Sequence, residues 1–341
     1  ASRWNEPCVP VYTTGTSIDT GGQPRESLRT VYGRIDQDID RAIELLEKAR
    51  ETTLAENNKS HINLYVALGI KSRACLAEGD WDGAFKAAKR VIDEGGYAVG
   101  TKSDLTSGMN SLDKQNVMWG AGIQVADQAG GYAGFFTHMD NKEGAYAKSA
   151  PKLISKQLYN RISATDIRRD WWDPSDKESP YVSKKFSFAN VASFLGDYIY
   201  MRVEEMYFTA AEAALRLDDL KSARELMNTV MAERDPGYSA NNRSGTLLGA
   251  TTTTWTGSFL ENILTHRRIE LWGEYGRLFD VRRLGQGIDR RTDDGFSEEC
   301  ISMMNRRNVN ITKADTYDWV LTIPKAELDA NPNINEEDQN P

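Results

Sequence analysis

The chain has 341 residues, of which 42 are Lys or Arg and 50 are Asp or Glu, so its formal net charge is −8. Its share of 40% hydrophobic and 27% charged residues is typical of a globular protein and excludes a disordered one. The acidic balance excludes general nucleic-acid binding, which needs a basic surface to neutralise phosphates. The three cysteines allow one disulfide at most, which excludes a small cysteine-stapled fold.

The first part of the chain predicts an extended lead-in followed by helices. Residues 1–26 are rich in Thr, Gly, Pro and Ser and show no periodicity. Apolar residues then recur at helical spacing and predict a helical scaffold over residues 27–96. Three helices are expected in this scaffold. The first spans about residues 28–46, the second follows a cap at Ser60, and the third begins at Trp81. The last two form a helical hairpin with a very short turn.

A second helical hairpin is predicted within residues 201–341. Its helices span Met206–Leu217 and Leu220–Arg234, and its turn residue Asp219 aligns with Asp80 of the first hairpin. Small residues recur in both hairpins, where they permit the close packing of tetratricopeptide-type helices. The sequence therefore predicts a mainly α fold with little β structure, in which tetratricopeptide-like hairpins form a scaffold interrupted by long irregular loops.

The segment between the two scaffold parts, residues 97–200, has a different character. Glycines alternate there with aromatic residues, and the only helix expected begins at Pro151. A second irregular stretch, residues 237–257, precedes a last helix expected over about 258–275. Because long structured loops in a compact domain are often functional, we assign ligand binding to residues 97–200.

The sequence contains none of the common catalytic or metal-binding motifs. Its three histidines are far apart, and there is no Cys-x-x-Cys pair, phosphate-binding loop or nucleophile elbow. Asp173, Asp176 and Glu178 carry the oxygen ligands that calcium prefers, but a solvated acidic turn is the simpler interpretation. No carboxylate pair stands out as a glycosidase acid and base. We therefore predict no cofactor and no enzymatic activity.

Charged residues of alternating sign follow helical spacing in the C-terminal third of the chain. Arginine and carboxylate side chains at this spacing can form bidentate pairs. Because they lie beside large apolar residues, we predict partly buried ion pairs that hold the C-terminal helices together, rather than an anion site. The residues are Arg202, Glu205, Glu212, Arg267, Glu270, Glu274, Arg277, Asp280 and Arg283.

Three segments of the same region occur in a characteristic order. They read YMRVEEMYFTAAEAA at 200–214, RRIELWGEYGRLFDVRRLG at 267–285 and IPKAELDANP at 323–332. This combination resembles the SusD/RagB family of Bacteroidetes outer-membrane nutrient-binding lipoproteins. The chain departs from the family pattern at Tyr275, where a Gly is usual, and at His266, where an acid often stands.

The resemblance implies a single domain over 1–341 that captures a nutrient at the cell surface without catalysis, usually an oligo- or polysaccharide. The expected partner is a SusC-like TonB-dependent outer-membrane transporter. The resemblance also implies an outer-membrane, surface-exposed lipoprotein, held to the membrane by an N-terminal lipid anchor that this chain lacks. We expect a further N-terminal helical portion to be missing as well. Cys8 lacks the apolar run of a lipidation site.

If the ligand is a glycan, aromatic side chains in the irregular loops are expected to bind it, because sugar rings present apolar faces to aromatic rings. Trp171 and Trp172 are adjacent, so both cannot face the same way in an extended chain. Peptide capture by the RagB-like branch and a tetratricopeptide protein-interaction scaffold remain alternatives. The candidate ligand-binding residues are Tyr132, Phe135, Phe136, Trp171, Trp172 and Trp255.

Overall fold

The computed structural model describes residues 3–17, 19–50, 58–126, 133–242, 257–286 and 320–340. Helices dominate this part of the chain, and its strands form three small antiparallel sheets of two strands each. The prediction of a mainly α fold with little β structure is confirmed. None of the helices in these ranges is long and apolar enough to cross a membrane.

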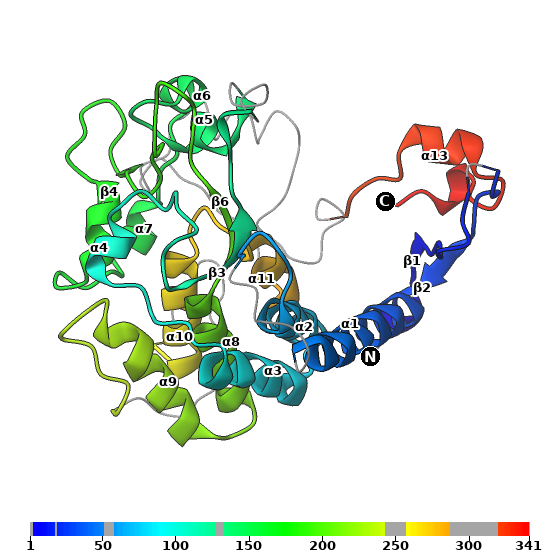
Figure 1. Cartoon of the computed structure of the whole chain (residues 1–341), viewed down its shortest axis with the longest axis horizontal. Coiled ribbons are helices and arrows are strands. Elements are labelled where there is room, and N and C mark those ends of the chain that lie inside the picture. The colour runs from blue at the N-terminus through cyan, green and yellow to red at the C-terminus, as the bar shows by residue number, and fades with distance from the viewer. Residues whose placement is uncertain are drawn as a thin grey trace.

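The scaffold consists of two helical hairpins that pack against each other (Figure 1). Helix α8 lies at its centre and contacts α3, α9 and α10, while α1 packs on α2. Ala84 and Ala213 are fully buried in one cluster with Cys75, so small residues do permit the close approach of the hairpins. The helices are α1 (Leu28–Arg50), α2 (Leu64–Glu78), α3 (Trp81–Glu94), α8 (Val203–Arg216), α9 (Leu220–Ala232) and α10 (Phe259–Glu270).

The two hairpin turns carry the same helix cap. The carboxylate of Asp80 accepts a hydrogen bond from the Gly83 amide at 3.0 Å, and that of Asp219 accepts one from the Ser222 amide at 3.0 Å. Replacing either aspartate by Ala is expected to lower the free energy of unfolding by about 1 kcal/mol, since the amide loses its acceptor. Urea unfolding followed by circular dichroism measures this loss, and replacement by Asn should restore most of it.

Three predicted helix boundaries were wrong. Asn63 rather than Ser60 caps α2, and it accepts a hydrogen bond from the Val66 amide at 2.9 Å. No helix begins at Pro151, because the Ile154 amide donates to the Tyr181 carbonyl instead, so α7 is confined to Lys156–Tyr159. Helix α10, expected to reach about residue 275, ends at Glu270, before Gly273 adopts a left-handed conformation, and a separate helix α11 (Arg277–Arg283) follows.

The irregular segment joins the scaffold through the sheet formed by β3 (Val117–Ala121) and β6 (Tyr198–Arg202) (Figure 1). Strand β6 runs directly into α8, so the loops are anchored to the central helix. Short elements decorate the loops: α4 (Lys102–Leu105), α5 (Phe135–Met139), α6 (Ala145–Ser149), β4 (Trp172–Asp173) and β5 (Val182–Ser183).

The two ends of the described chain pack against each other, away from the main body (Figure 1). The guanidinium of Arg25 donates to the Asp338 carbonyl and to the Asn340 side chain, both at 2.9 Å. The side-chain amide of Asn331 donates to the backbone carbonyl of Gln23 at 2.9 Å. The elements of this unit are β1 (Pro7–Pro10), β2 (Arg25–Ser27) and α13 (Lys325–Ala330).

Candidate functional site

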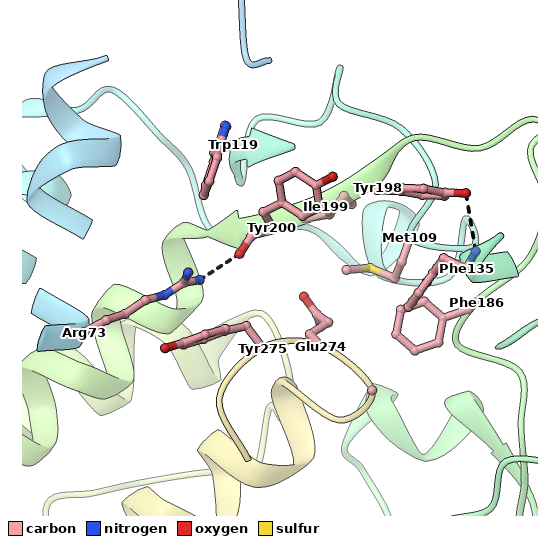
Figure 2. Close-up of a pocket in the computed structure, with 11 residues that line it drawn as sticks. Arg73, Met109, Trp119, Phe135, Phe186, Tyr198, Ile199, Tyr200, Glu274 and Tyr275 are labelled. Carbon is pink, nitrogen blue, oxygen red and sulfur yellow. Dashed lines mark hydrogen bonds between the residues drawn. The ribbon is translucent and has the colours of Figure 1, made fainter. Parts of the chain in front are cut away.

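A pocket of about 460 Å³ lies between α2, the β3–β6 sheet and the loop that follows α10 (Figure 2). Most of its lining is aromatic, and its apolar remainder comes from Met109, Ile199 and Gly273. Two charged side chains, Arg73 and Glu274, complete the described lining. The aromatic residues are Trp119, Phe135, Phe186, Tyr198, Tyr200 and Tyr275.

The sheet supplies one wall of the pocket. Tyr198 and Tyr200 alternate along β6, so both side chains can face the same side of the sheet. The rings of Trp119 and Tyr200 meet edge to face with centroids 5.1 Å apart. Tyr200 is 41% exposed, which leaves part of its ring free to contact a ligand.

The irregular loops supply a second wall. Phe135 contacts Phe186 edge to face at 5.2 Å, and its backbone amide donates to the Tyr198 hydroxyl at 3.3 Å. Gly273 permits this packing, because a Cβ atom there would lie 2.6 Å from the Phe186 ring. Loop and scaffold residues therefore meet at the pocket.

Arg73 extends from α2 into the edge of the pocket. Its guanidinium forms a bidentate pair with Glu205 at 2.8 and 2.7 Å and also donates to the Tyr200 carbonyl at 2.7 Å. It stacks 3.7 Å from the ring centroid of Tyr275, which stands where the sequence pattern usually has a Gly. These contacts fix the guanidinium in one orientation.

Glu274 faces the pocket from the loop that follows α10, beside Tyr275 (Figure 2). Its carboxylate accepts hydrogen bonds from Lys185 at 2.5 Å and from Arg202 at 2.7 and 2.8 Å. Burial alone would raise the pKa of Glu274, but Arg202 and Lys185 outweigh it and hold the pKa below its usual value. Burial lowers the pKa of Lys185 to about 8, against the opposing effect of Glu274. Lys185 and Glu274 thus form a buried ion pair at the pocket.

These pairs belong to a larger buried network. Glu270 is fully buried and accepts hydrogen bonds from Arg168 at 3.1 Å, from Arg202 at 3.0 Å and from Arg234 at 3.0 Å. The predicted ion pairs between the C-terminal helices are confirmed, with Arg277 as an exception, since it donates to the neutral side chain of Gln286. Arg202 connects this network to the pocket, because it pairs with both Glu270 and the lining residue Glu274.

Comparison with protein families identifies the chain. Residues 137–341 match the model of the SusD family, which covers more than half of the chain. The chain belongs to the SusD family. A search of curated proteins found no match.

Solved SusD-like structures share the fold over nearly the whole chain. A SusD-like carbohydrate-binding protein of Bacteroides vulgatus is 25% identical, with a TM-score of 0.75 over 97% of this chain and 71% of its own. A SusD superfamily protein of Bacteroides thetaiotaomicron is 22% identical, with a TM-score of 0.77 over 100% of this chain and 72% of its own. Surface glycan-binding protein A of Bacteroides uniformis is 17% identical, with a TM-score of 0.66 over 99% of this chain and 74% of its own.

The pocket of this SusD-family chain contains one of the aromatic residues predicted from the sequence, Phe135. Phe136 is only 2% exposed and packs behind it. Trp171 and Trp172 are 2% and 1% exposed and lie in the core of the loop region, where the Trp171 indole donates to the Leu105 carbonyl at 2.7 Å. Packing of the loops onto the scaffold has thus taken both tryptophans away from solvent. Tyr132 and Trp255 lie outside the described residues.

Sequence reasoning missed most of the aromatic lining. Trp119 stands in an apolar run, which we associate with core packing, and Tyr200 opens a family motif that we interpret as structural. One signal could have found the wall: the alternation of Tyr198 and Tyr200 before a helix is typical of a strand with one aromatic face. No such local signal exists for Arg73, which reaches the pocket from a different helix.

A second pocket of the SusD-family chain, of about 690 Å³, is more polar and lies beside α6 and β5. Its lining includes the acidic cluster Asp173, Asp176 and Glu178. The carboxylates bind nearby backbone amides: Asp173 accepts from Ser175 at 3.0 Å and Asp176 from Ser179 at 2.7 Å. Within the described ranges, no group of three or more His, Cys, Asp or Glu residues is placed to hold a metal ion.

Proposed function

We propose that this protein binds an oligo- or polysaccharide in the aromatic pocket and does not cleave it. The observation that carries the proposal is the lining itself, six aromatic rings beside two charged side chains held by ion pairs. Such a surface suits sugars, whose apolar C–H faces stack on rings and whose hydroxyl groups need polar partners at the edge. The SusD-like relatives named for carbohydrate and glycan binding support the same ligand class.

The expected affinity is modest. If each sugar ring buries about 100 Å² of apolar surface, it contributes roughly 2.5 kcal/mol at about 25 cal/mol per Å². Two or three stacked rings, less the cost of association, give millimolar to micromolar binding. This range allows capture of a nutrient and its later release.

We further propose that the protein acts at the cell surface and passes the glycan to a SusC-like TonB-dependent transporter. As a surface-exposed lipoprotein of the outer membrane, the protein would capture the glycan without cleaving it and hold it for import by the transporter. The family membership supports this role. Co-purification of the protein with a transporter from outer membranes, and its loss after mild detergent stripping of lipoproteins, would test it.

The binding site is tested by replacing Tyr200 with Ala. This change is expected to weaken glycan binding at least tenfold, because a stacked ring contributes more than the roughly 1.4 kcal/mol that a tenfold change requires. Affinity electrophoresis through gels that contain different polysaccharides identifies the ligand, and calorimetry measures its affinity. No sugar should be released on incubation.

A matched control is Tyr146→Ala on α6, since Tyr146 is 37% exposed but lies outside the pocket lining. It should bind glycan as the wild type does. Equal binding by the Tyr200 variant and the wild type would exclude this pocket. Retardation by no glycan, together with binding of peptides that depends on Tyr200, would favour the RagB-like peptide branch instead.

A further inference from the structure

The two charged residues of the pocket differ in what they can still offer a ligand. Arg73 uses Nε and Nη2 for Glu205 and for the Tyr200 carbonyl, whereas its Nη1 donates to no residue in the described part of the chain. Glu274 is already engaged through both carboxylate oxygens by Lys185 and Arg202. Among the described residues, the pocket therefore offers a ligand the N–H groups of one cation, while its carboxylate is neutralised by two cations.

The spare donor is held in place before a ligand arrives. The guanidinium lies 3.7 Å from the Tyr275 ring centroid, and its bidentate pair with Glu205 fixes its plane. The Arg73 side chain is only 13% exposed, so water screens it weakly. A hydrogen bond from Nη1 to an anionic oxygen would thus be charge-assisted and would cost little side-chain entropy.

The chain of ion pairs that begins at Arg73 carries an excess of one positive charge. Glu205 is shared by Arg73 and, at 3.7 Å, by Arg267. From Arg267 the ion pairs continue in an unbroken chain that contains four guanidinium groups and three carboxylates, an excess of one positive charge. The members are Arg73, Arg267, Arg283 and Arg216 against Glu205, Asp280 and Glu212.

We infer that the glycan captured in this pocket is acidic, and that its carboxylate or sulfate group accepts hydrogen bonds from Nη1 of Arg73. The neighbouring sugar ring then lies against the aromatic wall that Tyr200 and Trp119 form. This inference rests on the proposed glycan-binding function and adds the chemical class of the ligand. A hydrogen bond from a guanidinium N–H group to an anionic oxygen is charge-assisted, and it is therefore stronger than the bond that the same group donates to a neutral hydroxyl.

The experiment compares pairs of polysaccharides that differ only in charge. Polygalacturonate is tested against its methyl ester, and a sulfated galactan against the unsulfated galactan, by affinity electrophoresis and calorimetry with the wild-type protein. The acidic member of one pair is expected to bind at least tenfold more tightly at low salt. The difference should shrink in about 0.5 M NaCl, because sodium screens the exposed charges of the acidic polysaccharide and chloride competes for the guanidinium. The pair that responds distinguishes a carboxylate from a sulfate.

Variants at Arg73 supply a second readout. Arg73→Gln should remove the preference for the acidic member, because its affinity for that member should fall at least tenfold more than its affinity for the neutral member, a selective loss that general destabilisation cannot produce. If this variant does not fold, Arg73→Lys is the alternative, because it keeps the charge that faces Glu205 but lacks the guanidinium N–H groups. Its preference for the acidic member should be smaller than that of the wild type. Lys86→Gln on the exposed face of α3 is the matched control and should bind as the wild type does.

Equal or tighter binding of the neutral members would overturn the inference and leave the proposed function intact. Binding of neither member of any pair, nor of any other glycan, would reject the proposed function and this inference with it. An acidic preference that persists unchanged in Arg73→Gln would also overturn it, because the anion would then be bound elsewhere.

Discussion

Replacing Glu270 by Gln is expected to lower the free energy of unfolding by roughly 3–5 kcal/mol. Glu270 is fully buried between α10, α9 and β6 and accepts hydrogen bonds from Arg168, Arg202 and Arg234. Without its charge, one positive charge of this buried cluster loses its counter-ion where water cannot solvate it. Urea unfolding followed by circular dichroism measures the change.

Acid should remove the same contribution. Burial alone would raise the pKa of Glu270, but Arg234, Arg202 and Arg168 outweigh it and hold the pKa well below its usual value. Since the folded-state pKa is depressed, the contribution is complete above the unfolded pKa of about 4.3 and is lost as pH falls below it. The wild type should therefore lose stability in acid more steeply than Glu270→Gln.

Glu44→Gln is the control for both measurements. Glu44 pairs with Arg41 and Lys48 on the exposed face of α1, where water and salt screen the charges. We expect no measurable shift in its unfolding midpoint. An unfolding curve of Glu270→Gln that superimposes on that of Glu44→Gln would contradict the central role of the buried network.

Replacing Trp171 by Ala is expected to cost about 3–5 kcal/mol of stability. The side chain packs against Trp172 and other core residues of the loop region, and its indole donates to the Leu105 carbonyl. Truncation would leave a large cavity and an unpaired buried carbonyl. The sequence alone, which predicts Trp171 as a ligand platform, leads to the opposite expectation that folding stays intact.

Tyr200→Ala provides the comparison, because its partly exposed ring leaves no enclosed cavity when it is removed. Its unfolding midpoint in urea should stay well above that of Trp171→Ala. If Trp171→Ala instead unfolded like the wild type and lost glycan binding, the tryptophan would be a ligand platform and the loop packing described here would be wrong.

The scaffold could be predicted because its signals are local. Helical periodicity and the turn residues Asp80 and Asp219, which cap the helices that follow them, act within one turn of chain, so they identify the hairpins without knowledge of the rest of the molecule. The helix expected at Pro151 failed for the complementary reason. The backbone amide of Ile154 donates to the carbonyl of Tyr181, far along the chain, and such a pairing produces no periodic pattern in the sequence.

The sequence by itself determined the fold class, the helical hairpins and most of the charged residues that pair between the C-terminal helices. It also identified aromatic residues in the irregular loops as candidates for a binding site. Only the tertiary structure decided which rings remain accessible: it buries Trp171 and leaves part of Tyr200 exposed. It also brings Arg73 from α2 to Tyr275 after α10. The reason is that burial and long-range contacts depend on how distant segments pack, whereas helix formation depends on neighbours along the chain.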